Sequence, residues 1–137
     1  MSETPSSKPN PNPGERQLAI RVLAMPADTN PAGDIFGGWI MSQADVAGSI
    51  IAVQVAQGRV VTVAVNEFQF IAPAYVGDLV SCYAEVERRG RTSIRSKVEV
   101  YAQRDRDPGS DHLIAEASIT YVAVDENSKP RVLPELK

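Results

Sequence analysis

The chain has 137 residues, of which 43% are hydrophobic and 23% are charged, values typical of one globular domain. Its formal net charge of −3 argues against general binding to nucleic acid or to an anionic membrane surface. The chain has one cysteine, Cys82, so it cannot form an intramolecular disulfide. Cys82 and the single histidine, His112, are too few ligands for a zinc site. We therefore expect no bound metal.

The two ends of the chain differ in composition from the middle. Residues 1–14 contain four prolines and almost no apolar side chains, so we expect a disordered N-terminal tail. This segment lacks the apolar core of a secretory signal, and no apolar run approaches the roughly 18 residues of a membrane span. We expect a cytoplasmic protein with one domain over residues 15–128. Residues 129–137 are expected to form an extended C-terminal tail.

The first predicted elements are a strand, a loop and a helix. Alternating apolar side chains predict a strand over residues 16–25, and the residues after it are rich in Pro, Asp, Asn and Gly, as in a loop. Gly37 and Gly38 lead into a helix that continues to about Gln57, where Gly58 ends it. Apolar residues cover most of this helix, which is typical of a helix buried in a core.

Four strands are predicted after the helix, over residues 60–70, 78–88, 94–100 and 113–124. In the first of them the apolar parity changes near Asn66 and Glu67, which indicates a β-bulge. One strand, one long helix and four antiparallel strands in a meander predict an α+β hotdog fold, an antiparallel sheet wrapped around one long central helix. The competing ferredoxin-like fold needs a second helix, for which the sequence has no pattern.

One face of the predicted helix is small and polar. Its members recur at spacings of four and three: Gly38, Ser42, Asp45, Ser49 and Ala52. Asp45 is the one charged residue of the helix. On the pattern alone, it can be structural, bonded to backbone or to a base, or it can be a general base beside a space that these small residues leave open.

The paired glycines at the helix start favour a functional interpretation. The first N–H groups of a helix have no intrahelical acceptor, and glycine lets a ligand carbonyl oxygen approach them closely. Such donors can stabilise an oxyanion. Asp34, just before the helix, is expected to cap it.

A family resemblance rests on these residues. The run MPADTNPAGDIFGGWIMSQAD from Met25, followed by GRVVTVAV from Gly58 and VGD at residues 76–78, resembles the hotdog acyl-CoA thioesterases of the bacterial YciA type. The resemblance covers roughly residues 16–133. It implies hydrolysis of short-to-medium-chain acyl-CoA to the free acid and coenzyme A.

The resemblance also implies a catalytic pair. In the family, a loop asparagine and an acidic residue fifteen positions later act together, and Asn30 and Asp45 have this spacing. Asp45 would be the general base that activates water, with direct attack of its carboxylate on the carbonyl as the alternative. Asn30 would orient the water or the carbonyl, and the N–H of Gly38 would stabilise the oxyanion. This mechanism uses no serine nucleophile and no cofactor, since coenzyme A is part of the substrate.

A basic segment offers a second candidate site. Residues 88–97 contain five of the fourteen basic residues, a pattern typical either of a solvated hairpin or of a phosphate-binding turn. The resemblance implies that this turn meets the nucleotide of coenzyme A and that an edge strand lies along the pantetheine arm. The residues so implied are Gly90, Arg91, Thr92 and Ser93 for the nucleotide, Val63, Ala64 and Val65 for the arm, and Arg59 as a further phosphate ligand.

Finally, the resemblance implies a homo-oligomer, with a dimer as the unit and a hexamer as the assembly. Its sites lie between subunits, so Asn30 and Asp45 can come from different chains. Two alternatives stay open. A non-catalytic acyl-CoA-binding hotdog module is one. A hotdog dehydratase is the other, but it uses a histidine with a helix carboxylate, and His112 lies far from the predicted helix in sequence.

Overall fold

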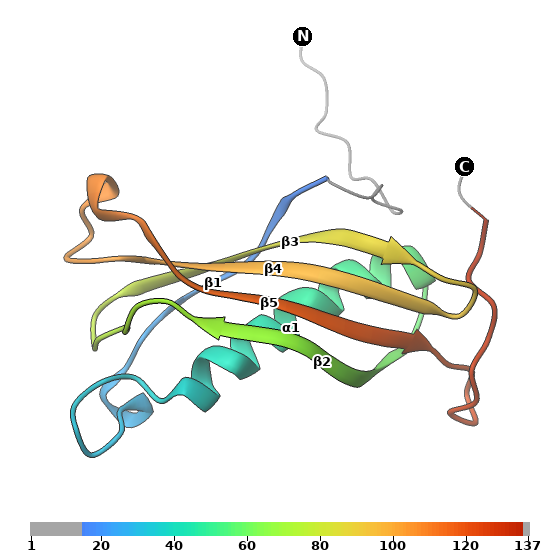
Figure 1. Ribbon diagram of the computed structural model, residues 1–137, viewed down its shortest axis with the longest axis horizontal. Helices are drawn as coiled ribbons and strands as arrows, with labels where there is room; N and C mark the ends of the chain where they lie inside the picture. Colours follow the sequence, from blue (N-terminus) through green and yellow to red (C-terminus); the bar gives the residue numbers. More distant parts are fainter. Residues whose placement is uncertain (1–14, 136–137) are drawn as a thin grey trace, which may run out of the picture.

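The computed structural model describes residues 15–135, which form one five-stranded antiparallel sheet and one long helix (Figure 1). The elements are β1 (Gln17–Leu23), η1 (Pro26–Asp28), α1 (Gly37–Ala56), β2 (Val60–Phe70), β3 (Leu79–Arg89), β4 (Ser93–Gln103), η2 (Pro108–Ser110) and β5 (His112–Ala123). The predicted α+β hotdog fold is confirmed. The predicted tail over residues 1–14 lies outside the described residues.

The strand order is β1-β3-β4-β5-β2. β3, β4 and β5 form a meander as expected, but β2 pairs with β5, so the prediction that the meander begins with β2 is wrong. Each pair is antiparallel, so the two edge strands β1 and β2 run in the same direction. A parallel crossover of this kind needs a long connection, which α1 provides.

The core lies between α1 and one face of the sheet (Figure 1). The sheet-facing side of α1 is buried and rich in alanine, so the helix lies close to the strands. Along β4, buried and half-buried residues alternate, because successive side chains of a strand point to opposite faces. Ser96 is the one polar residue on the buried face of β4, and its hydroxyl donates to the carbonyl oxygen of Gly48 at 3.0 Å.

The other side of α1 is not buried. Met41, Val46 and Val53 are 37%, 48% and 43% exposed, so the expectation of a helix buried nearly all round is wrong for the single chain. By length and apolar composition α1 could also cross a membrane, contrary to the expectation that no segment of the sequence could. The core helix of a soluble protein passes the same test, and α1 packs on the sheet as such a helix does.

The predicted β-bulge in β2 is confirmed. The pairing of β2 with β5 shifts register between Thr62 and Ala64 and again between Val65 and Glu67. Val63 and Val65, at these irregular positions of an edge strand, are 53% and 46% exposed. The edge of the sheet beside α1 therefore presents apolar side chains to its surroundings.

Candidate active site

Asp45 lies on α1 and is bonded to two strands. Its side chain is half-buried, and its Oδ1 atom accepts hydrogen bonds from the Thr62 hydroxyl at 2.9 Å and from the Tyr121 hydroxyl at 3.0 Å. Thr62 on β2 and Tyr121 on β5 are directly paired in the sheet. Two neighbouring strands thus present donors to the same carboxylate oxygen.

A cavity of about 270 Å³ adjoins this carboxylate. Gly38 is the second residue of α1, so its N–H has no intrahelical acceptor, and a Cβ added there would meet nothing within 4 Å. The space beside Gly38 is therefore open, whereas a Cβ at Gly37 would lie 3.2 Å from the Phe70 ring. The cavity is lined by Gly38, Met41, Ser42, Asp45, Val65 and Ile119.

Asn30 lies in the loop before α1 and faces a different cavity. Its Oδ1 atom accepts from the N–H groups of Ala32 at 2.9 Å and Asp34 at 3.2 Å, which holds the side chain in a tight turn. The cavity that Asn30 lines has a volume of about 350 Å³ and is also lined by residues 70–73. Within one chain, the structure does not bring Asn30 and Asp45 together.

The expected helix cap at Asp34 is wrong. The N-cap residue of α1 is Phe36, with no side-chain cap hydrogen bond. Asp34 lies too early in the chain, because the helix starts at Gly37; its carbonyl oxygen instead accepts from the N–H of Asn30 at 2.7 Å. Asp34 lines the same cavity as Asn30.

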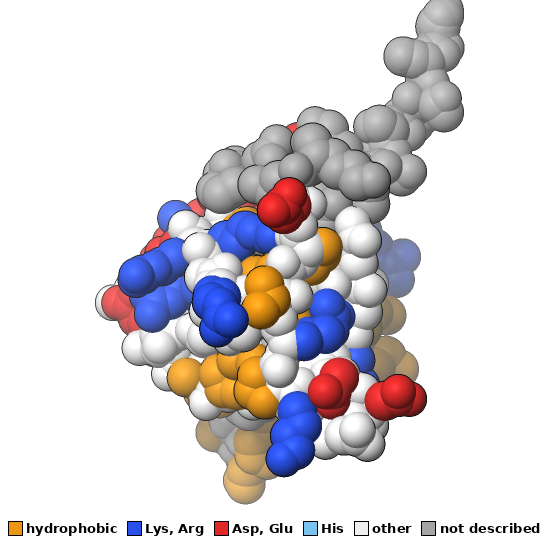
Figure 2. All heavy atoms as spheres, turned by 90° about the vertical axis from the view of Figure 1, so that its right-hand side faces the viewer, with side chains coloured by type: hydrophobic (Ala, Val, Ile, Leu, Met, Phe, Trp, Pro, Cys, Tyr) orange, Lys and Arg blue, Asp and Glu red, His pale blue; other side chains and the backbone are white. Residues whose placement is uncertain are grey.

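The basic turn between β3 and β4 holds a third cavity, of about 160 Å³. The N–H of Gly90 donates to the Ser93 carbonyl oxygen at 2.8 Å and closes the turn. Arg91 is exposed and Thr92 is half-buried, and neither lines the cavity. Figure 2 shows Lys and Arg side chains spread over this end of the molecule. The cavity is lined by Arg88, Gly90, Ser93, Arg95 and Thr120.

Arg88 and Arg95 were not among the individual residues expected at the site. They are directly paired across the β3–β4 hairpin, so both guanidinium groups belong to one small area. Of the other expected residues, Val63 and Val65 lie exposed on β2, and Ala64 pairs with Thr120. Arg59 is exposed and donates from Nη1 to the Asp125 carbonyl oxygen at 3.4 Å.

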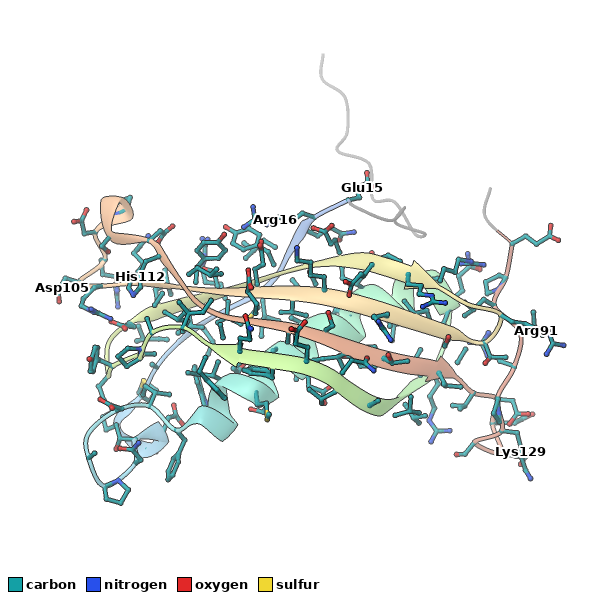
Figure 3. All side chains as sticks on the ribbon, in the orientation of Figure 1. Glu15, Arg16, Arg91, Asp105, His112 and Lys129 are labelled. Carbon is teal, nitrogen blue, oxygen red and sulfur yellow. The ribbon has the colours of Figure 1, made fainter. Side chains whose placement is uncertain are left out.

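His112 is remote from Asp45. It is the first residue of β5, whereas Tyr121, which contacts Asp45, lies nine residues further along the strand. That separation is roughly 30 Å along an extended strand. Figure 3 shows His112 and Arg91 at opposite ends of the sheet. Among residues 15–135, no three His, Cys, Asp or Glu side chains are grouped so that they could hold a metal ion.

Sequence reasoning missed both donors to Asp45. In the sequence, Tyr121 lies on the apolar parity of its strand with Ala117 and Ile119, and a buried tyrosine hydroxyl normally needs a hydrogen-bond partner. The burial of the Tyr121 hydroxyl therefore indicates that a polar group lies opposite it on the helix. Thr62 gave no comparable signal, because threonine is common on the solvent face of strands.

Known proteins resemble this chain in sequence and in structure. The family model of the thioesterase superfamily matches residues 32–108. The acyl-CoA thioester hydrolase YciA of Salmonella typhimurium is 50% identical over 125 residues, which make up 90% of this chain and 94% of that protein. A hexameric thioesterase from Yersinia pestis is 50% identical with a TM-score of 0.82, over 87% of this chain and 96% of that one. A hexameric hotdog-fold thioesterase of Campylobacter jejuni is 43% identical with a TM-score of 0.79, over 85% and 90%.

The family model covers more than half of the chain, and the relatives match it nearly from end to end with the same fold. The chain therefore belongs to the thioesterase superfamily, and within it to the YciA-type acyl-CoA thioester hydrolases.

Proposed function

We propose that this protein hydrolyses short-to-medium-chain acyl-CoA to the free acid and coenzyme A, in the cytoplasm. One observation carries the proposal: Asp45, the single charged residue of α1, borders a cavity that is also lined by Gly38, whose N–H has no intrahelical acceptor. A base and an oxyanion donor beside one cavity are what thioester hydrolysis by water requires. Membership of a family of acyl-CoA thioester hydrolases supports the same reaction.

In the proposed reaction, Asp45 removes a proton from a water molecule as the water oxygen forms a bond to the thioester carbonyl carbon. The negative charge that develops on the carbonyl oxygen is stabilised by the N–H of Gly38. The carbon–sulfur bond then breaks, and the coenzyme A thiolate takes the proton from Asp45. Asn30 orients the water or the carbonyl. The reaction consumes no cofactor.

A serine nucleophile is not part of this proposal. Ser42 lines the cavity, but its hydroxyl donates to the Trp39 carbonyl oxygen at 2.8 Å. The chain's one histidine, which would have to activate a serine, is His112 at the far end of β5.

The substrate and the assembly follow from the surface features. The arginine-lined cavity beside Gly90 and Ser93 suits the phosphates of coenzyme A, and the exposed edge of β2 suits its pantetheine arm. We place the catalytic site between two subunits, because Asn30 and Asp45 line different cavities of one chain. The apolar edge at Val63 and Val65 supports a dimer, and the hexameric relatives support an assembly of three dimers.

The first test replaces the proposed base. In Asp45→Ala and Asp45→Asn, we expect hydrolysis of butyryl-CoA, followed by trapping the released thiol, to fall at least about 100-fold. Binding of coenzyme A and the thermal unfolding temperature should change little, since Asp45 is half-buried at a cavity and outside the apolar core. Ser49→Ala is the control, because it removes a polar group one turn further along the same helix face.

Two results would contradict the proposal in different ways. Near-wild-type turnover in Asp45→Ala would remove Asp45 as the base. Binding of butyryl-CoA by the unaltered protein without release of coenzyme A would favour the alternative, a non-catalytic acyl-CoA-binding module.

A further inference from the structure

The Tyr121 hydroxyl reaches from the sheet to the proposed base. Tyr121 is fully buried on β5, and its hydroxyl lies 2.7 Å from the backbone carbonyl oxygen of Asp45 and 3.0 Å from Oδ1 of the same residue. One proton is therefore shared between two acceptors of one residue. Gly48 makes this approach possible, because a Cβ at that position would overlap the Tyr121 hydroxyl.

Both side-chain donors to Asp45 bind the same oxygen. Thr62 and Tyr121 donate to Oδ1, and within residues 15–135 no group is hydrogen-bonded to Oδ2. A carboxylate held through one oxygen keeps its orientation while the other oxygen stays available. The cavity next to Asp45, of about 270 Å³, is large enough for a water molecule to approach this carboxylate.

We propose that Tyr121 is a positioning residue for hydrolysis: together with Thr62 it holds Asp45 through Oδ1 and leaves Oδ2 to act as the base. This inference rests on the proposed function, since it concerns the same carboxylate. Tyr121 does not touch the substrate; it acts through Asp45.

Tyr121 stays a donor across the working pH range. Burial, and then the negative charge of Asp45 and the hydrogen bond to it, raise the pKa of Tyr121 above its ordinary value. In the described part of the chain, Tyr121 is the titratable group that faces Asp45. Thr62 does not titrate, and the helix-facing residues of β3 and β4 include one titratable side chain, the buried thiol of Cys82.

The test is Tyr121→Phe, which keeps the buried ring and removes the donor. We expect kcat for butyryl-CoA to fall about 10-fold or more, with KM within about twofold of the unaltered protein. The split between kcat and KM separates a positioning role from a structural one, because a merely destabilised protein loses active enzyme without a selective fall in the turnover of bound substrate.

Ser96→Ala is the matched control. Ser96 is also fully buried, and its hydroxyl donates to the carbonyl oxygen of Gly48 on the same helix, without contact to Asp45. It should lower the unfolding temperature much as Tyr121→Phe does, yet leave kcat and KM unchanged. If Tyr121→Phe fails to fold, Gly48→Ala displaces the same hydroxyl with the tyrosine in place and should give the same kinetic signature.

The possible outcomes distinguish a failure of this inference from a failure of the proposed function. If Asp45→Ala is inactive and Tyr121→Phe behaves like Ser96→Ala, the positioning role is wrong and the proposed function stands. If Asp45→Ala remains active, both fail. A fall in kcat with an unchanged KM in Tyr121→Phe, absent from Ser96→Ala, supports the inference.

Discussion

At the scale of single residues, burial changes the acid–base chemistry of Cys82. This side chain lies in the middle of β3 with 0% exposure, and burial raises the pKa of its thiol from 9.0 to about 12. The thiol therefore stays neutral and acts as a small apolar group, as buried cysteines usually do. It is neither a nucleophile nor a metal ligand in this fold.

The shift in the pKa of Cys82 predicts a loss of stability in alkali. The thiol ionises near pH 9.0 in the unfolded chain and near pH 12 in the folded protein. The contribution of the buried neutral thiol to the free energy of unfolding is therefore fully present below pH 9 and is lost as the pH rises from 9 to 12. The slope attributable to one thiol is at most about 1.4 kcal/mol per pH unit. Urea unfolding of Cys82→Ala between pH 8.5 and 10, with a reductant, should show a shallower decline than the unaltered protein. Parallel curves would show that the thiol contributes nothing.

At the scale of elements, the C-terminal segment connects the end of α1 to the β3–β4 turn. Arg131 donates from Nη2 to the Ala56 carbonyl oxygen at 3.0 Å and from Nε to that of Val124 at 3.0 Å. The N–H of Leu133, which is buried, donates to the Arg91 carbonyl oxygen at 2.9 Å. Gly58 follows the helix for a spatial reason, since a Cβ there would lie 2.6 Å from Arg131 Nη2.

This arrangement makes Arg131 important for stability. A cation near the last carbonyl groups of a helix interacts favourably with the helix dipole, and its removal leaves the Ala56 carbonyl oxygen without this donor. We expect Arg131→Met to lower the free energy of unfolding in urea by about 1–2 kcal/mol. Arg106→Met, at an exposed arginine in the loop before β5, should change it by less than about 0.5 kcal/mol. Equal effects in both variants would contradict this role.

At the scale of the whole molecule, the apolar edge formed by β2 and α1 explains why a single chain is incomplete. Val63 and Val65 on β2 lie exposed, as do Met41, Val46 and Val53 on α1. A second copy packed beside this surface would remove these apolar side chains from solvent. The proposed dimer therefore accounts both for the exposed apolar surface and for the separation of Asn30 from Asp45.

Subunit mixing tests the shared site. Asn30→Ala and Asp45→Ala should each be inactive alone. In mixed dimers one of the two sites has both residues intact, so random mixing in co-expressed protein should restore about one quarter of wild-type activity with butyryl-CoA. If Asn30 and Asp45 act within one chain, mixing restores nothing. Light scattering of each variant checks that the assembly is unchanged.

The sequence by itself determined the elements and the polar face of the helix. Alternation and helical periodicity are local properties, so the order and approximate positions of the strands, the bulge in β2 and the face containing Gly38 and Asp45 could be predicted, whereas β4 extends three residues beyond its expected end at residue 100. Only the tertiary structure decided that β2 lies beside β5, because an alternating pattern is satisfied at any place in a sheet. It also decided which strands contribute donors to Asp45, since Thr62 and Tyr121 are far apart in sequence and meet only after β2 and β5 pair.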